Sequence, residues 1–400
     1  MAIAVATTGC TPSGPTDPDP TTSSTSSTTV PVADHGRVLG WGYNGFGNLG
    51  DGTLSNQPSP VALQLPDGVD ATAVAAGGFH TLAIGTDGVT YAVGRDDNGE
   101  LGDDPAFAYR VTPVPVASPP GVRFLAVSAG GNHSLAIGDD GNTYAWGLDA
   151  QGQLGDGPGL GNQPTPVRVA TPPGVHFVSV SAGFAHSLAI GDDGNTYAWG
   201  YDHYSELGDD AAHVDQPAPV RVATPPGVVF TEVAAGGHHN LAIASDGSTY
   251  AWGWNAYGQL GDATTSDRDL PTAVSGPTGL RRVAAGAHHS LGIGADGRVL
   301  AWGSDEEGEL GDDAALASRS VPTPSALGIT VRRIAAGGRH SVAVDEHGGL
   351  HVWGSDDEGE MGDGPPSSGH PTPVAVALPG GASAIDISAG YYHAVAIAVP

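Results

Sequence analysis

Lysine is absent from the 400-residue sequence, and all 14 basic residues are arginines, against 43 aspartates and glutamates. The formal net charge at pH 7 is therefore −29. Proteins bind nucleic acids and anionic lipids mainly through lysine and arginine contacts to phosphate, so a chain this acidic would be repelled by both. The charge argues against a nucleic-acid partner and favours a basic protein or a cation.

Three further absences narrow the class of protein. Cys10 is the only cysteine, so no disulfide can form within the chain. No apolar run reaches 18 residues, so we expect no membrane-spanning helix. The sequence also lacks a Gly-x-Ser-x-Gly elbow and a phosphate-binding loop. We therefore expect a protein that is not an enzyme and has no cofactor.

A unit of 50 to 53 residues recurs seven times after residue 35. Each copy carries a turn glycine, at Gly36, Gly88, Gly141, Gly194, Gly247, Gly297 and Gly348. Five residues later stands a tryptophan in six copies and Val93 in the other. A histidine precedes each turn, and a Leu-Gly-Asp corner follows each tryptophan, with methionine replacing leucine in the last copy. Such a period indicates stacked repeats that share one core.

Each unit contains four short runs with strand character. Asp140-Gly141 separates the first two runs and predicts a hairpin with a type I′ turn, because glycine readily adopts a positive φ. Four short strands in about 50 residues, without helical periodicity, are typical of a propeller blade. In the copy around Gly141 the expected strands are 133–137, 142–147, 165–170 and 176–181.

The two ends of the chain complement each other. The last copy stops over residues 394–400, where its hairpin should turn, and the chain resumes that hairpin at residues 34–38. One blade is therefore built from both termini, which closes the ring. The predicted fold is all-β: a closed seven-bladed β-propeller of four-stranded blades over residues 36–400.

The N-terminal segment precedes the repeats and differs from them. Residues 1–10 are short, apolar and end in Gly9-Cys10, which resembles the end of a bacterial lipoprotein signal, although no basic start is present. Two interpretations stay open: a truncated signal with Cys10 lipidated, or a terminus without such a role. Residues 11–35 are rich in Thr, Ser and Pro and predict a disordered linker. The first interpretation implies export to the cell envelope or exterior, and the second a cytoplasmic protein.

The repeated motifs resemble the regulator of chromosome condensation repeat family. They are Ala-Gly-x-x-His, Asp-Gly, Trp-Gly and Gly-x-Leu-Gly-Asp, and they cover residues 36–400. The resemblance implies a propeller, but the family includes guanine-nucleotide exchange factors, chromatin-docking proteins, ultraviolet-B sensors and β-lactamase inhibitors. The charge argues against chromatin docking, and the single surplus tryptophan, Trp254, argues against photoreception. Nucleotide exchange on a small GTPase is the alternative function.

The repeated histidines raise the question of a metal site. Occurrence in every copy favours a structural hydrogen bond to a neighbouring strand or turn, so we expect no metal. Only the additional histidines at His238 and His288, in adjacent copies, are candidates for another role.

Residues that differ between copies are better candidates for function. Acidic and aromatic side chains between Trp-Gly and Leu-Gly-Asp should emerge on one ring face. The acidic loops fit a solvated surface, a docking site for a basic partner or a Ca²⁺ site, although their spacing matches no EF-hand loop. Exposed aromatics are typical interface anchors. We expect a monomeric protein-binding platform with these candidate contacts: Asp96, Asp97, Tyr109, Tyr201, His203, Tyr204, Trp254, Tyr257, Asp305, Glu306, Glu307, Asp356, Asp357 and Glu358.

Overall fold

The computed structural model describes residues 35–104, 108–211, 213–276, 279–312 and 316–400. The proposed signal at residues 1–10, including Cys10, lies outside the described residues, as does the linker except for its last residue. Within the described residues, one 3₁₀ turn, η1 (Pro379–Gly381), is the helical element, and no helix is long and apolar enough to cross a membrane.

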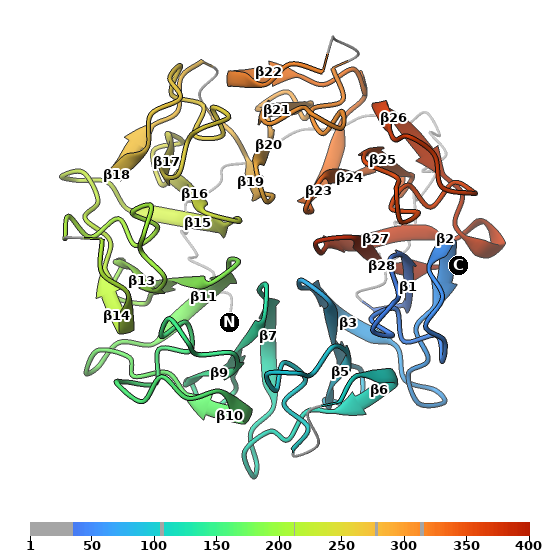
Figure 1. The fold of residues 1–400 in the computed structure, drawn as a ribbon, viewed down its shortest axis with the longest axis horizontal. Coiled ribbons are helices and arrows are strands. Elements are labelled where there is room, and N and C mark those ends of the chain that lie inside the picture. The colour runs from blue at the N-terminus through green and yellow to red at the C-terminus, as the bar shows by residue number, and fades with distance from the viewer. Residues whose placement is uncertain (1–34, 105–107, 212, 277–278, 313–315) are drawn as a thin grey trace, which may run out of the picture. The chain divides into compact units, whose positions relative to one another are not determined.

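Seven four-stranded antiparallel sheets surround a central axis (Figure 1). Blade 1 contains β3 (Ala71–Ala76), β4 (His80–Gly85), β5 (Thr90–Gly94) and β6 (Arg110–Pro115). Blade 2 contains β7 (Phe124–Ala129), β8 (His133–Gly138), β9 (Thr143–Gly147) and β10 (Gln163–Arg168). Blade 3 contains β11 (Phe177–Ala182), β12 (His186–Gly191), β13 (Thr196–Gly200) and β14 (Gln216–Arg221).

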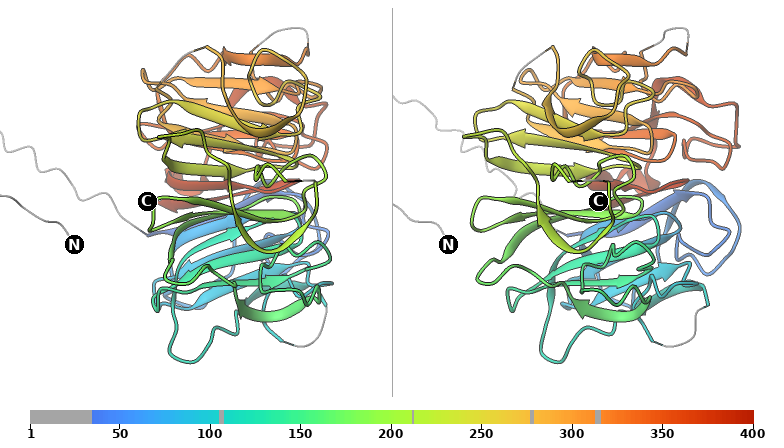
Figure 2. Two further views of the ribbon diagram at one scale, coloured as in Figure 1. Left: turned by 90° about the vertical axis from the view of Figure 1, so that its left-hand side faces the viewer. Right: turned by 60° about the vertical axis from the view of Figure 1, so that its left-hand side comes forward.

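The remaining blades repeat this order. Blade 4 contains β15 (Phe230–Ala235), β16 (His239–Ala244), β17 (Thr249–Gly253) and β18 (Arg268–Ala273). Blade 5 contains β19 (Arg282–Ala285), β20 (His289–Ile293), β21 (Val299–Gly303) and β22 (Arg319–Pro324). Blade 6 contains β23 (Val331–Ala336), β24 (His340–Asp345), β25 (Leu350–Gly354) and β26 (His370–Val376). Figure 2 shows the blades from the side, with loops emerging at both ends of the strands.

Blade 7 is the composite blade. Its strand order is β2 (Gln57–Ala62), β1 (Arg37–Gly42), β28 (His393–Val399) and β27 (Ser383–Ala389), so each terminus supplies two strands. β1 and β28 pair without a register shift, from Arg37 opposite Ala398 to Gly42 opposite His393. The predicted closed ring of seven four-stranded blades is confirmed.

The hairpin turn around Gly141 differs from the predicted type. Gly141 has φ of 77°, but Asp140 is not among the residues with positive φ. The Gly141 amide donates to the Gly138 carbonyl at 3.0 Å, and the Gly138 amide donates to the Asn142 carbonyl at 2.8 Å. This is a three-residue loop, a type I turn followed by a left-handed glycine. The hairpin is confirmed and the type I′ turn is wrong, because a non-glycine residue avoids positive φ.

The repeated tryptophans join each blade to the one before it. Six of them are fully buried. In blade 2, the Trp146 indole Nε1 donates to the Glu100 carbonyl of blade 1 at 2.8 Å. Gly102, two residues after Glu100, has φ of 66°, and a Cβ there would lie 2.9 Å from the indole. The corner glycine is therefore required both by its backbone conformation and by the tryptophan.

The repeated histidines make a second bond between blades. His80 Nε2 in blade 1 lies 2.9 Å from Ser134 Oγ in blade 2. The Ser134 hydroxyl donates to the Glu100 carbonyl at 3.0 Å, the same oxygen that accepts the Trp146 indole. Since the serine proton goes to that carbonyl, His80 must donate from Nε2, and this fixes its neutral tautomer.

The histidine contact recurs in six of the seven blades. The acceptors are Ser134, Ser187, Asn240, Ser290, Ser341 and Thr81. At the sixth junction Ala394 stands at the corresponding position, directly after His393. Both ring nitrogens of His340 are consequently left without a hydrogen-bond partner within the described residues.

Backbone bonds between glycine-rich turns close the centre of the ring. The Gly78 amide donates to the Gly130 carbonyl at 2.9 Å, and equivalent bonds run through every blade to the Tyr391 amide, which donates to the Gly77 carbonyl at 3.2 Å. A Cβ on Gly77 would lie 2.5 Å from the Gly130 carbonyl oxygen. The first glycine of Ala-Gly-x-x-His is thus needed for close approach of adjacent backbones.

We predict that Ala394→Ser stabilises the ring. The new hydroxyl would accept the His340 Nε2 proton, a net gain of about 0.5–1.5 kcal/mol for one buried hydrogen bond. The thermal unfolding midpoint should rise. Ser187→Ala is the matched control in an intact junction, and it should cost about 1–3 kcal/mol by leaving His133 Nε2 unpaired. A lower midpoint for Ala394→Ser would contradict this assignment.

We also predict that five of the seven repeated histidines stay neutral at pH 5. Burial lowers the pKa of His133, His289 and His393 to about 3 and that of His80 and His340 to about 4. Burial also lowers the pKa of His186 and of His239. NMR spectra of the imidazole nitrogens should report neutral rings for His80, His133, His289, His340 and His393 at pH 5, with the proton on Nε2 in all of them except His340, whose tautomer no hydrogen bond fixes.

The sign of the associated stability change follows from these lowered pKa values. The contribution of the neutral histidines is present above the unfolded pKa of about 6.5 and is lost as the pH falls towards 4 and below. Buried carboxyl groups oppose this change, because burial raises the pKa of Asp96, Glu309 and Glu360 to about 7. Site-resolved spectra are therefore the sharper test, and an imidazolium signal from any of these five histidines at pH 5 would contradict the prediction.

Candidate protein-binding face

The loop after each Trp-Gly is organised by one buried polar side chain. Asp96 Oδ1 accepts the amide of the corner residue Leu101 at 3.0 Å. Asp305 and Asp356 accept the equivalent amides at 3.0 and 3.1 Å. These three carboxylates are 3%, 1% and 0% exposed, whereas the sequence predicts them at the surface. They therefore shape the loops from inside and offer no exposed charge to a partner.

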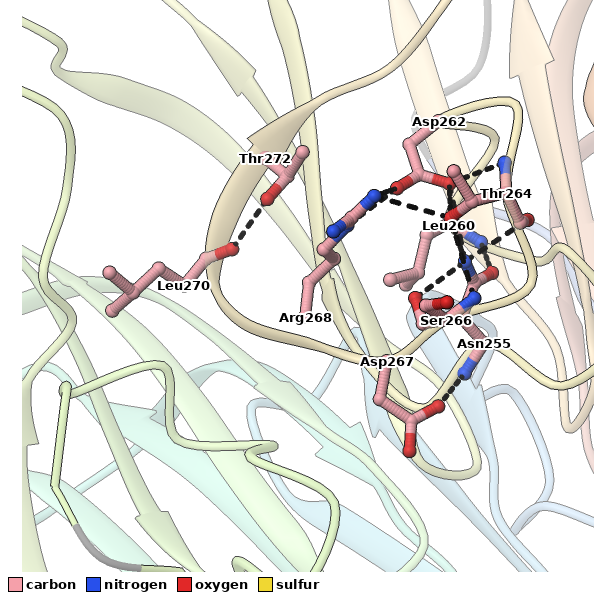
Figure 3. A network of polar contacts seen from close by, with 9 residues as sticks. All are labelled: Asn255, Leu260, Asp262, Thr264, Ser266, Asp267, Arg268, Leu270 and Thr272. Carbon is pink, nitrogen blue, oxygen red and sulfur yellow. Dashed lines mark hydrogen bonds and ion pairs between the residues drawn. The ribbon is translucent and has the colours of Figure 1, made fainter.

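Figure 3 shows the same network in blade 4, where asparagine takes the aspartate's place. Asn255 Oδ1 accepts the Leu260 amide at 3.0 Å, and its Nδ2 donates to Asp262 Oδ1 at 3.2 Å. The opposite oxygen of Asp262 accepts Arg268 Nε at 2.6 Å. Arg268 thus compensates a nearly buried carboxylate and ties the loop to the start of β18.

Arginine recurs at the position of Arg268 in blades 1 and 5, whereas blades 2, 3 and 7 have glutamine there. Arg110 and Arg319 pair with corner aspartates in blades 1 and 5, at 2.7 and 2.9 Å. In blade 6 the counterpart is His370, whose Nε2 lies 3.5 Å from Asp363 Oδ2. His370, Asp363 and Asp356 form the group of three potential metal ligands found among the described residues. His370 therefore stands where arginine pairs with the corner aspartate in blades 1, 4 and 5.

The remaining acidic candidates lie on the loops at the surface. Asp97, Glu306 and Asp357 are exposed, and Glu307 and Glu358 are half-buried. Two of the five are paired: Asp97 lies 2.7 Å from Arg95, and Glu307 lies 3.3 Å from Arg339. These loops therefore carry exposed negative charge next to a few arginines.

The structure brings most of the aromatic candidates together. Tyr201, His203, Tyr204, Trp254 and Tyr257 lie in one network with ring centroids 5.0–6.1 Å apart. Such spacings are those of favourable aromatic pairs. Tyr109 is 48% exposed and joins no aromatic pair within the described residues.

The network extends beyond the predicted residues across the ring axis. Phe184 of blade 3 and Tyr391 of blade 7 have centroids 5.7 Å apart, and both line a cavity of about 80 Å³ at the axis. We call the whole network the aromatic arc. Its members are Tyr43, Phe46, Phe79, Phe184, Tyr201, His203, Tyr204, His238, Trp254, Tyr257, His288, Tyr391 and Tyr392.

Sequence reasoning missed six members of the arc: Tyr43, Phe46, Phe79, Phe184, Tyr391 and Tyr392. Phe79, Phe184, Tyr391 and Tyr392 occupy the variable positions of Ala-Gly-x-x-His, and Tyr43 directly follows Trp-Gly. Aromatic residues at variable positions of a fixed motif were the available signal. The motif places these positions beside the axis, where copies far apart in the chain meet.

The additional histidines belong to the arc. Trp254 contacts both, with ring centroids 6.3 Å from His238 and 5.2 Å from His288. His238 Nδ1 lies 2.8 Å from Oε1 of Glu206, a fully buried carboxylate whose Oε2 accepts the Tyr204 amide at 2.8 Å. Glu206 therefore holds both His238 and the Tyr204 loop in place from below.

A pocket of about 270 Å³ opens beside this part of the arc. Phe184, Tyr201 and His238 supply its aromatic walls, and Asn132 and Gln151 supply side-chain amides. We call it the Tyr201 pocket. It combines apolar walls with a few polar groups, which is the usual make-up of a binding pocket.

We predict that Arg268→Gln destabilises the protein by about 1.5–3 kcal/mol, the range for hydrogen bonds to charged groups. Asp262 would keep its negative charge in a nearly buried position without its compensating guanidinium. Arg298→Gln is the control, since Arg298 is 63% exposed and 4.0 Å from Asp296. The control should change stability by less than about 0.5 kcal/mol. Equal midpoints for both variants in denaturant unfolding would refute the prediction.

The chain is similar in sequence to several known proteins. The chain is 29% identical over 361 residues to the ultraviolet-B receptor UVR8 of Arabidopsis thaliana, covering 90% of this chain and 70% of UVR8. It is 31% identical over 351 residues to the human E3 ubiquitin-protein ligase HERC2, covering 84% of this chain but only 7% of HERC2.

Solved structures show the same architecture. The crystal structure of human WBSCR16 superposes with a TM-score of 0.82 at 26% identity, covering 91% of this chain and 100% of that one. Prp20p from Saccharomyces cerevisiae gives a TM-score of 0.82 at 24% identity, covering 91% and 92%, a likeness of fold. The family model of the RCC1-like domain matches residues 37–396. The chain therefore belongs to the RCC1-like domain family.

Proposed function

We propose that this protein is a non-catalytic, protein-binding propeller whose contact surface is the aromatic arc. The observation that carries the proposal is the continuity of the arc, which joins loops and turns of blades 1, 3, 4, 5 and 7 around the axis. Tyrosine, tryptophan and phenylalanine are enriched at protein interfaces, where they bury large rigid surfaces at little entropic cost.

The environment of the arc supports binding. Its aromatic side chains are partly exposed, with Phe184 at 36%, while the loops beneath are held by buried hydrogen bonds. A surface already ordered before binding loses little conformational freedom when a partner docks. Proteins of this fold do bind other proteins, since Prp20p is described with binding properties to Gsp1p and histones.

The charge points to a basic partner. Asp97, Glu306 and Asp357 are exposed on the loops around the arc, and the whole chain carries −29. Opposite charge on the partner would speed association and orient it on this face.

We further propose that the propeller is exported and held at a bacterial cell envelope through lipidated Cys10. Gly9-Cys10 and the Thr/Ser/Pro-rich residues 11–35 support this location, because an anchored domain needs an extended tether. Mass spectrometry of the native protein tests it. A Cys10 peptide carrying the lipid mass is the expected result, and an unmodified Cys10 peptide would refute the anchor.

We predict that the paired change Tyr204→Ser and Trp254→Ser abolishes partner capture. Each buried aromatic anchor contributes on the order of 2 kcal/mol or more, so the partner's affinity should fall at least tenfold. Wild-type protein and the variants are compared by affinity capture from envelope and soluble fractions, followed by binding measurements with the recovered partner. Leu125→Ser is the control, an exposed side chain outside the arc and outside the candidate contacts.

Two outcomes would overturn the proposal. The first is equal affinity of the paired variant and the wild type for the recovered partner. The second is accelerated nucleotide release from a small GTPase that persists in the paired variant, which would favour the exchange function instead. The thermal midpoint of the paired variant serves to confirm that the ring remains folded.

A further inference from the structure

We propose that the Tyr201 pocket receives an arginine side chain of the partner. The inference deepens the proposed function and rests on it, because it names the group that the aromatic arc recognises. It is carried by the pocket's size, its aromatic walls, its electrostatic surroundings and a guanidinium already bound elsewhere in the arc.

The size of the pocket suits a side chain. Its volume of about 270 Å³ lies just below the range of about 300–1,000 Å³ that is usual for small-molecule and cofactor sites. A single extended side chain needs less space than a cofactor, and it would enter from the partner's surface. Phe184, which lines the pocket, is 36% exposed.

The walls of the pocket favour a cation with a flat shape. His238 lies at the centre of the aromatic wall, with ring centroids 5.7 Å from Tyr201 and 5.9 Å from Phe184. The faces of aromatic rings attract cations, and a planar guanidinium stacks on them while its edge donates hydrogen bonds. Asn132 and Gln151 also line the pocket; Asn132 Oδ1 accepts Arg95 Nη1 at 3.2 Å, and Gln151 Oε1 accepts Gln153 Nε2 at 3.3 Å.

The arc already holds one guanidinium in this way. Arg95 lies over the rings of Phe46 and Phe79, 5.6 and 6.0 Å from their centroids. Its Nη1 donates to Asn132 Oδ1 at 3.2 Å, and its Nε to Asp97 Oδ2 at 2.7 Å. Asn132 also lines the Tyr201 pocket, so the internal arginine and the proposed site are neighbours.

The pocket has negative charge close to it. Glu206, fully buried, lies beneath His238 and bonds to it at 2.8 Å. Burial raises the pKa of the Tyr201 phenol most, and Glu206, Tyr204 and Asp215 raise it further. The carboxylates of Glu206 and Asp215 therefore act at the pocket wall. A cation entering the pocket would therefore be attracted both by the rings and by the carboxylates behind them.

Arginine is favoured over lysine by the geometry. A lysine ammonium is a compact, strongly hydrated charge, and burying it between rings removes water that few groups here replace. A guanidinium is less strongly hydrated and can stack and donate simultaneously, as Arg95 does. Citrulline keeps the shape of arginine without its charge, which makes it the critical comparison.

The test uses seven-residue Gly/Ser peptides with arginine, lysine, citrulline or leucine at the centre. Binding to the full-length protein is measured by NMR titration at low ionic strength, where single-residue affinities are accessible. We expect the arginine peptide to bind at least tenfold more tightly than the citrulline and leucine peptides, and more tightly than the lysine peptide. Tyr201→Ala should abolish that preference, whereas Leu125→Ala, at an exposed side chain outside the arc, should leave it unchanged.

The outcomes distinguish failure of the arginine site from failure of the proposed function. Equal binding of the arginine and citrulline peptides, binding of none of them, or an unchanged preference in Tyr201→Ala would overturn the arginine site. If the natural partner still loses affinity in the Tyr204→Ser, Trp254→Ser protein, the aromatic face stands without that site. If the arginine preference is found but partner capture is insensitive to Trp254, the pocket stands and the proposed interface fails.

Discussion

At each blade junction, one backbone carbonyl oxygen accepts the side-chain hydrogen bonds that connect neighbouring blades. The residue before the corner leucine, such as Glu100, presents its backbone oxygen to the next blade, where the Trp146 indole and the Ser134 hydroxyl both donate to it. Ser134 in turn accepts from His80. All of these groups are buried, and an unpaired buried polar group costs about 1–3 kcal/mol. Where all three side chains are present, the carbonyl accepts the indole and the hydroxyl, and the hydroxyl accepts the histidine.

This constraint explains which residues of the repeat are fixed. Tryptophan fills the wedge between sheets while donating one hydrogen bond, and the corner glycine leaves space for its ring. The two junctions that depart from the pattern show its limits. Val93 replaces the tryptophan and packs near Gly50, while Ala394 leaves His340 without a partner. A ring with six complete histidine contacts closes nonetheless, because the backbone bonds between glycine turns are made at every junction.

The fixed junctions leave the outer loops and the variable turn positions available for recognition. Aspartate or asparagine inside each loop holds the backbone, so the neighbouring positions can change without loss of shape. In blades 3 and 4 those positions hold Tyr201, Tyr204, Trp254 and Tyr257. The turns beside the axis add Phe184 and Tyr391, which bridge blades that are far apart in the chain. The residues that differ between copies are therefore the candidates for recognition, and the repeated residues hold them in place.

The sequence alone determined the ring, the number of its blades and the composite blade, because seven copies with a common period admit one arrangement of closed sheets. It also identified Tyr201, Tyr204, Trp254 and Tyr257 as exceptions to the repeat. Tertiary structure decided how the acidic residues divide: Asp96, Asp305 and Asp356 lie inside their loops, whereas Asp97, Glu306 and Asp357 lie outside. The sequence of an irregular loop has no periodic pattern that distinguishes its buried positions from its exposed ones. The assembly of the arc was likewise a tertiary outcome, since Phe184 and Tyr391 are more than 200 positions apart in the chain and meet only when the ring closes.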